Sequence, residues 1–143
     1  MSKYLVIDAS FTLGLLLPGP HQERCRALVT QWHRDGYMLC APTLWFYEIT
    51  SALCRAIHSG QITRDEGRQA LTLAQKLDVQ LFPPDDAQTT LAFDWTMQLK
   101  RAAAYDSFYL ALAEALRSDL WTADKRLGNA AGVSWIHLIG VSQ

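Results

Sequence analysis

The stretch AAAYDSFYLALAEALRSDLWTADKRL, residues 102–127, predicts a buried helix followed by a buried strand. Between Phe108 and Leu116 the only polar side chain is Glu114, so we expect the helix to be apolar on nearly every face and to lie deep in the core. The next run, LWTA at residues 120–123, is short and β-prone, which is typical of a strand in a parallel sheet. This stretch therefore indicates an α/β fold.

An acid stands at the start of this helix and another at the end of this strand. Asp106 opens the helix, and Asp124 follows the strand directly. Open α/β proteins bind their ligands at the carboxyl edge of the sheet, so the two acids predict a functional site there. A purely structural role is an equal alternative for each residue alone, because Asp is favoured as a helix N-cap and in first turns.

Strands and helices alternate along the rest of the chain, with no linker or repeat between them. Strands are predicted at residues 4–7, 37–41, 79–82, 120–123 and 133–139, the first of them central. Helices are predicted at residues 22–34, 44–58, 64–77, 85–100 and 106–116, with short turns at 11–17 and 125–131. We expect Ser10 and Thr43 to cap the segments that follow them, and Thr63 to form a capping box. The pattern predicts a single domain, residues 1–143, built on a parallel sheet with helices on both faces.

The composition indicates a compact domain, since 50% of the 143 residues are hydrophobic and 19% are charged. The first apolar run, residues 4–7, is too short for a signal peptide, and no run approaches the length of a membrane span, so we expect a soluble, cytoplasmic protein. The three cysteines lack CxxC spacing, which favours buried thiols over zinc ligands. The sequence contains no GxGxxG, GxxxxGK or GxSxG motif. The net charge of −1 neither indicates nor excludes a nucleic acid partner.

Two further acids occupy comparable positions earlier in the chain. Asp8 directly follows the predicted strand 4–7, and Glu48 falls on the inward face of the helix that begins after Thr43. An unpaired carboxylate in such a place costs on the order of several kcal/mol unless a cation meets it. Helix capping by Asp8, and a solvent-facing Glu48, are open alternatives.

Four acids at one sheet edge would raise one another's pKa unless they share a cation. Ligation by oxygen alone favours Mg²⁺ or Mn²⁺ over zinc. The sequence therefore predicts a divalent metal site formed by Asp8, Glu48, Asp106 and Asp124.

The motifs around these acids resemble those of the PIN domain family, and within it the VapC-type ribonuclease toxins of bacterial toxin-antitoxin pairs. The resemblance covers essentially the whole chain through four motifs in order, DAS at 8–10, EITSAL at 48–53, YDSFYLALA at 105–113 and TADKRL at 122–127. It implies a three-layer α/β/α sandwich with a central, mostly parallel five-stranded sheet. It also implies Mg²⁺-dependent cleavage of RNA, a homodimer and a cognate antitoxin protein as partner.

The resemblance matches the same four acids to the catalytic and metal-binding residues of the family. It matches Ser10 and Thr122 to small hydroxyl residues beside them, in the cofactor site. Many relatives carry a further acid just after the last one, where this chain has Lys125.

Two functions of different classes are compatible with these residues. The first is a metal-dependent endoribonuclease, in which the metal activates a water that attacks phosphorus. The second is a catalytically silent RNA-binding or protein-interaction module, because a fold alone does not determine function. The presence of all four acids favours the nuclease. A phosphotransfer reaction with Asp8 as nucleophile is weaker, because Ser10 stands where a second acid would be needed.

Three consecutive aromatic residues, Trp45, Phe46 and Tyr47, lie in one predicted helix. One helical face cannot bury all three in a single small core. We therefore expect at least one of these rings to face a second subunit or an antitoxin segment, since exposed apolar patches usually mark interfaces.

Overall fold

A computed structural model describes residues 3–130 and 132–140. Within these residues there are five strands, namely β1 (Tyr4–Ile7), β2 (Met38–Pro42), β3 (Gln80–Phe82), β4 (Asp119–Thr122) and β5 (Ile136–Leu138). They form one sheet in the order β3-β2-β1-β4-β5, and every neighbouring pair is parallel. The structure thus confirms the predicted α/β class, the five-stranded sheet and the central place of the first strand.

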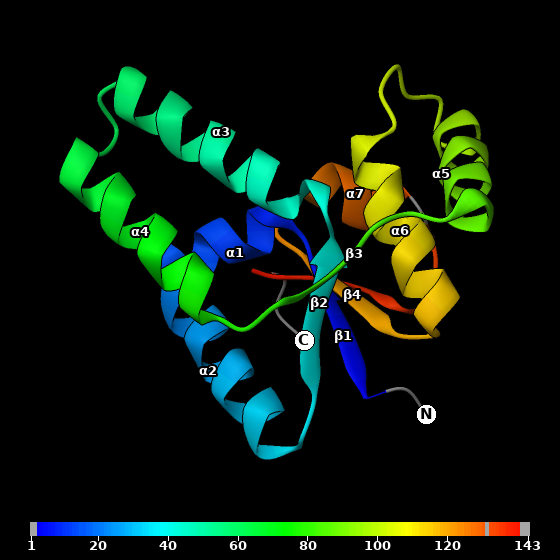
Figure 1. The fold of residues 1–143 in the computed structure, drawn as a ribbon, viewed down its shortest axis with the longest axis horizontal. Helices are drawn as coiled ribbons and strands as arrows, with labels where there is room; N and C mark the ends of the chain where they lie inside the picture. Colours follow the sequence, from blue (N-terminus) through cyan, green and yellow to red (C-terminus); the bar gives the residue numbers. More distant parts are fainter. Residues whose placement is uncertain (1–2, 131, 141–143) are drawn as a thin grey trace.

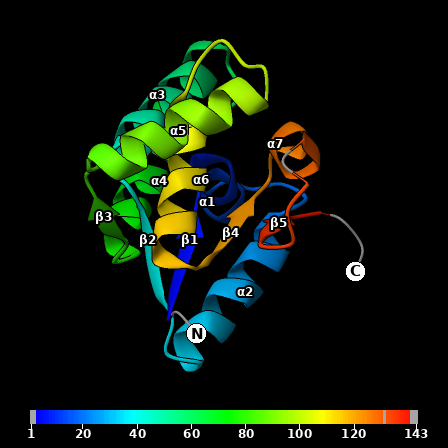
Figure 2. The same cartoon turned by 90° about the vertical axis from the view of Figure 1, so that its right-hand side faces the viewer.

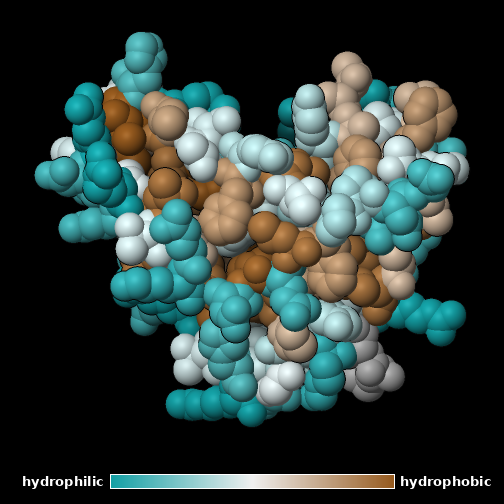
Figure 3. Space-filling model, in the orientation of Figure 1, coloured by the Kyte–Doolittle hydropathy of each residue, from teal (hydrophilic) through white to brown (hydrophobic). Residues whose placement is uncertain are grey.

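Helices cover both faces of the sheet. In the described part of the chain they are α1 (Ala9–Leu16), α2 (Gln22–Arg34), α3 (Leu44–His58), α4 (Arg64–Lys76), α5 (Asp86–Gln98), α6 (Tyr105–Leu116) and α7 (Lys125–Ala130). Helices α5 and α6 pack together on one side, and α1, α2 and α4 lie on the other (Figure 1, Figure 2). Helices α3 and α4 form a hairpin that projects from the body (Figure 1). The surface is hollowed between this hairpin and the part formed by α5 and α6 (Figure 3).

The core is centred on β1 and α6. Val6 of β1 is fully buried and pairs with Cys40 of β2 on one side and Leu120 of β4 on the other. Continuous apolar strands of this kind are typical of parallel sheets that are covered on both faces. Residues 109–113 of α6 are all buried, as the nearly unbroken apolar sequence predicts. This packing holds the first turn of α6, which carries Asp106, close to the sheet.

The α3–α4 hairpin is held by a helix cap and by close packing. The Thr63 hydroxyl accepts the N–H of Glu66, and the Glu66 carboxylate accepts the N–H of Thr63, which confirms the predicted capping box. Gly67 of α4 lies against Ile57 of α3, where an added Cβ would come within 2.6 Å of Ile57 Cδ1. The absence of a side chain at Gly67 therefore lets the two helices approach each other.

Two predicted caps differ from the structure. Residues 11–17, predicted as a turn capped by Ser10, belong largely to α1, and the N-cap of α1 is Asp8, whose Oδ1 accepts the N–H of Phe11 at 2.8 Å. Thr43 precedes α3 as predicted, but its side chain makes no capping hydrogen bond. Its backbone is already helical, whereas a capping residue is normally extended.

The structure also differs from the prediction in two element boundaries and in the exposure of one cysteine. The strand predicted at 133–139 shortens to β5, because the short strand β4 offers it only three paired residues. The turn predicted at 125–131 is the helix α7, and residue 131 lies outside the described residues. Cys25 and Cys40 are buried as predicted, whereas Cys54 is exposed. Among the residues described, no helix is long and apolar enough to cross a membrane.

Candidate active site

Four carboxylates from four separate places in the chain line one cavity of about 210 Å³, the acid cavity. Asp8 follows β1, Asp124 follows β4, Glu48 lies in the second turn of α3 and Asp106 in the first turn of α6. Because β1 and β4 are parallel neighbours, their carboxyl ends deliver Asp8 and Asp124 to the same edge of the sheet. The structure therefore brings together the four acids that the sequence singled out.

Asp8 is buried and accepts hydrogen bonds from three donors. Its Oδ1 accepts from the Phe11 N–H at 2.8 Å and the Ser10 hydroxyl at 2.7 Å, and its Oδ2 accepts from the Thr122 hydroxyl. Burial raises the pKa of Asp8 from 3.8 to about 6; the three hydrogen bonds oppose this shift and the Asp106 carboxylate adds to it. Asp8 thus caps α1, which was the alternative role considered for it, and at the same time it lines the acid cavity.

Ser10 and Thr122 connect the ends of β1 and β4. The buried Thr122 hydroxyl donates to Asp8 and accepts the N–H of Asp124 at 3.0 Å. The Ser10 hydroxyl donates to Asp8, accepts the N–H of Ala123 at 2.9 Å and lies 3.1 Å from the Thr122 hydroxyl. Through these contacts the hydroxyls of Ser10 and Thr122 fix the positions of the acids. Direct contact of either hydroxyl with a cofactor stays a prediction.

Glu48 is half-buried and is held by a residue that the sequence did not single out. The Tyr109 hydroxyl donates to Glu48 Oε1 at 2.7 Å. Burial raises the pKa of Glu48 and Asp106 adds to the rise, while the Tyr109 hydrogen bond and the charge of Arg55 oppose it. Burial and the nearby Glu48 carboxylate raise the pKa of Tyr109, so its phenol keeps the proton that it donates. Tyr109 lies three residues after Asp106 on α6, and this spacing could have indicated it.

Asp106 forms an ion pair with Arg101, which lies in the loop between α5 and α6. Arg101 Nη1 lies 2.9 Å from Asp106 Oδ2. Burial raises the pKa of Asp106 and the Asp124 carboxylate adds to the rise, while Arg101 and Arg126 oppose it. Arg101 is therefore one cation that meets the acids in this structure. No sequence signal pointed to it, because a loop residue has no periodicity.

Asp124 lies at the junction of β4 and α7. Its Oδ1 accepts the N–H of Arg126 at 2.9 Å and that of Leu127 at 3.4 Å. Asp124 therefore also begins the next helix, which was the alternative role considered for it. The carboxylate still lines the acid cavity. Like Asp8, Asp124 both caps a helix and lines the acid cavity.

The chemistry of these acids fits a divalent cation. The donors are carboxylate oxygens, which Mg²⁺ and Mn²⁺ prefer, and burial raises the pKa of Asp8, Glu48 and Asp106, so negative charge there is incompletely compensated. As the side chains are arranged, residues 3–130 and 132–140 contain no group of three or more His, Cys, Asp or Glu that could hold a metal ion. Tyr109 and Arg101 occupy oxygens of two of the acids. Metal coordination is accordingly a proposal.

Comparison with known proteins places this architecture in a family. The sequence model of the PIN domain matches residues 5–133. A VapC ribonuclease of Mycobacterium bovis and ribonuclease VapC9 of Mycobacterium tuberculosis are each 32% identical over 126 residues, which is 87% of this chain and 89% of theirs. This chain belongs to the PIN domain family, and within it to the VapC group.

Solved structures show the same fold. VapC20 of Mycobacterium tuberculosis, described as a Sarcin-Ricin loop cleaving toxin, superposes with a TM-score of 0.68 at 13% identity, over 94% of this chain and 98% of that one. VapBC2 of Rickettsia felis, bound to a DNA fragment from its promoter, superposes with a TM-score of 0.72 at 7% identity, over 95% and 98%. At such low identity these structures establish the fold alone.

Proposed function

We propose that this protein is a Mg²⁺- or Mn²⁺-dependent endoribonuclease and acts in the cytoplasm as the toxin of a toxin-antitoxin pair. The observation that carries the proposal is the convergence of four acids from distant parts of the chain on one cavity. The two mycobacterial relatives, both named as VapC ribonucleases, support the reaction class. We also propose that residues 1–143 form a single nuclease domain.

The side chains of the site have separable roles in this proposal. Asp8, Glu48, Asp106 and Asp124 would hold the cation. When bound, the cation supplies Lewis acidity and positive charge, which favour attack of water on a phosphodiester. Thr122 and Ser10 hold Asp8 in one orientation, and Tyr109 holds Glu48. Arg55 lines the acid cavity, where its guanidinium can bind a backbone phosphate.

The proposal is tested by incubating the purified protein with a panel of single-stranded and structured RNAs. Cleavage is expected with Mg²⁺ or Mn²⁺, loss of cleavage with a chelator, and recovery when the metal is added back. RNA binding without cleavage of any RNA under either metal would support the catalytically silent alternative in place of the nuclease.

A cognate antitoxin and a homodimer are the proposed protein partners. The structures similar in fold include VapBC toxin-antitoxin proteins, which supports an antitoxin. The homodimer follows from the family resemblance. We expect sedimentation at tens of micromolar, roughly the range in which weak dimers form, to show two copies; a strict monomer would contradict the homodimer.

We expect Arg101→Ala to tighten divalent cation binding. The guanidinium pairs with Asp106 and would repel a cation held by the same carboxylate, so its removal should strengthen Mn²⁺ binding by roughly three- to tenfold. Isothermal titration with Mn²⁺ measures this, with the exposed Arg34→Ala as the matched control. Unchanged or weaker Mn²⁺ binding by Arg101→Ala would show that the ion pair does not compete with the metal.

Lys125→Ala is expected to weaken RNA binding without changing metal affinity. Lys125 is exposed directly beside Asp124, where its ammonium can neutralise one backbone phosphate. Loss of one such contact should lower the slope of log affinity against log salt by about one. Titration of a labelled RNA at several salt concentrations measures the slope. Lys76→Ala, at the end of α4, is the control, and an equal effect of both substitutions would argue against a local phosphate contact.

A further inference from the structure

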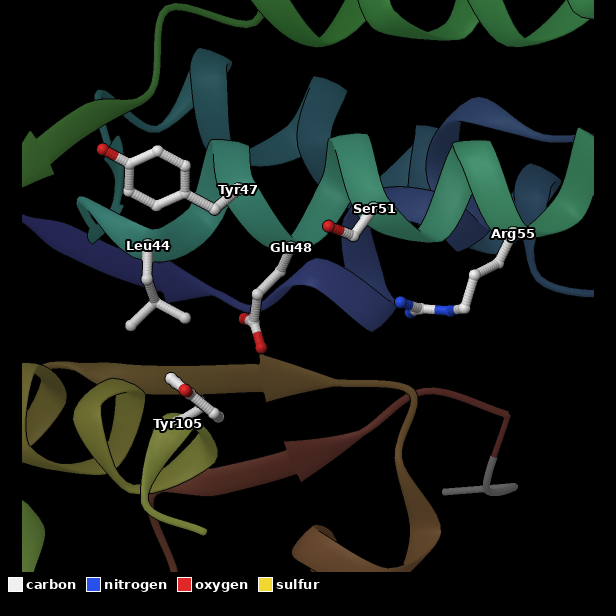
Figure 4. A pocket seen from close by; sticks show the side chains of 6 residues that line it. All are labelled: Leu44, Tyr47, Glu48, Ser51, Arg55 and Tyr105. Carbon is white, nitrogen blue, oxygen red and sulfur yellow. The ribbon is translucent and has the colours of Figure 1, made fainter.

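A second cavity adjoins the acid cavity along α3. It has a volume of about 370 Å³ and is lined by Leu44, Tyr47, Glu48, Ser51, Arg55 and Tyr105 (Figure 4). Glu48 and Arg55 line both cavities, so a ligand that reaches the acids can extend into the second one. The volume lies in the range of roughly 300–1,000 Å³ that is usual for small-molecule sites.

Two largely exposed tyrosine rings face this second cavity from different helices. Tyr47 of α3 is 75% exposed and Tyr105, the first residue of α6, is 65% exposed. Leu44 lies between them, on the wall formed by α3 (Figure 4). Each tyrosine immediately precedes a candidate catalytic acid, so the backbone that carries each ring lies beside the acid cavity. Exposed aromatic side chains gathered in a cavity commonly mark a binding site.

Arg55 supplies a positive charge at the far end of the second cavity. The guanidinium of Arg55 is directed back along α3 toward Glu48 (Figure 4). Arginine binds phosphate through a planar fork of N–H donors, which suits it to a nucleic acid backbone. The cavity thus presents aromatic rings at one end and a phosphate-binding group at the other, with Glu48 between them.

We propose that the second cavity binds an unpaired nucleobase of the RNA strand, stacked on Tyr47, while Arg55 binds a neighbouring backbone phosphate. This inference rests on the proposed ribonuclease function and adds which side chains hold a base beside the acids. A base within a duplex is already stacked on its neighbours, so only a single-stranded segment can place a base there. Tyr47 then faces RNA in place of the partner subunit or antitoxin expected from the sequence.

The inference is tested by a double-mutant cycle between the protein and the RNA. The probe is a single-stranded RNA that the protein cleaves, together with versions that carry one abasic nucleotide at each position around the cut. Tyr47→Ala is expected to lower kcat/KM by about 5- to 100-fold, the range for loss of one stacked base. One abasic position should cause a similar loss, and the two changes together should lower kcat/KM no further than either alone. Tyr47→Phe, which keeps the ring, should recover most of the loss.

Phe93→Ala is the matched control, since Phe93 is an aromatic residue of α5 that is 60% exposed and lies outside both cavities. Its effect should be small and independent of every abasic position. Independent effects of Tyr47→Ala and all abasic positions would overturn base stacking and leave the nuclease function intact. Conversion of a dimer into a monomer by Tyr47→Ala, seen in sedimentation, would also overturn it and assign the ring to a protein interface. Failure of the parent protein to cleave any RNA would overturn the proposed function and this inference together.

Discussion

Asp8→Asn is expected to abolish RNA cleavage, with a loss on the order of 100-fold or more. Asn keeps the size of the side chain and can still accept the N–H of Phe11, but it removes one negative charge from the acid cavity. Metal affinity and activity should therefore fall while the fold is kept. Cleavage assays and Mn²⁺ titration measure the two effects side by side. Asp94→Asn, the same change at an exposed position of α5, should cleave RNA as the parent does.

Cleavage by Asp8→Asn at the parental rate, across structured and single-stranded RNAs, would contradict the catalytic role of this site. Loss of cleavage in Asp94→Asn as well would show that the assay responds to general changes in charge.

The same substitution is expected to stabilise the metal-free protein at neutral pH. The pKa of Asp8 is about 6 in the folded protein against an ordinary 3.8, so the folded state binds more protons between these values. The stabilising contribution of protonated Asp8 is therefore complete below pH 3.8 and is lost as the pH rises through about 6. This loss amounts to roughly 3 kcal/mol of the free energy of unfolding, and the Asn variant does not undergo it because its side chain carries no charge.

Thermal unfolding in a chelator between pH 4 and 8 measures this effect. Asp8→Asn should melt several degrees above the parent at pH 7.5, and its stability should fall less between pH 4 and 6. Glu48 and Asp106 also have raised pKa values and contribute a slope of the same sign in both proteins, so the difference between the curves is the relevant quantity. Parallel curves of stability against pH for the two proteins would show that burial does not raise the pKa of Asp8.

Thr122→Val is expected to cost both stability and activity. Val keeps the shape of the buried side chain but lacks the hydroxyl that donates to Asp8 and accepts the N–H of Asp124. A buried carboxylate oxygen and a backbone N–H would each lose a partner, which should lower the free energy of unfolding by roughly 2–4 kcal/mol. Cleavage should fall as well, because Asp8 loses the contact that orients it.

Thr122→Ser is the matched control, because it keeps the hydroxyl and removes only a methyl group. It should cost roughly 1 kcal/mol. Urea unfolding at pH 7 compares the two variants, and cleavage assays follow the same pair. A Val variant as stable and as active as the Ser variant would show that the hydroxyl does not position the acids.

The order of the elements and the places of the acids could be predicted from the sequence because both depend on local signals. Continuous apolar runs that stop at an acid indicate buried parallel strands, and in such a sheet their ends share one edge. That reasoning placed Asp8 and Asp124 together. Glu48 joined them because a helical stripe shows which face is inward. The competing interpretation of Asp8 and Asp124 as helix caps was also right, since one carboxylate can cap a helix and line a cavity.

The partners of the acids could not be predicted in the same way. Tyr109 and Glu48 are far apart in sequence and meet only because α3 and α6 approach each other over the sheet edge. Arg101 lies in a loop, where no periodicity shows the direction of a side chain. Strand order beyond the central β1 was equally inaccessible, because it depends on how the helical connections cross the sheet.

The α3–α4 hairpin offers a practical place to attach a label. Its tip, residues 59–62, lies about ten residues beyond Glu48 along α3, or roughly 15 Å at the rise of an α-helix. Gly60 turns the chain there with a positive φ of 81° and has open space around it. A fluorophore or an affinity handle joined at this tip would lie well away from Glu48, so the protein could be immobilised or followed by single-molecule methods while that acid stays accessible.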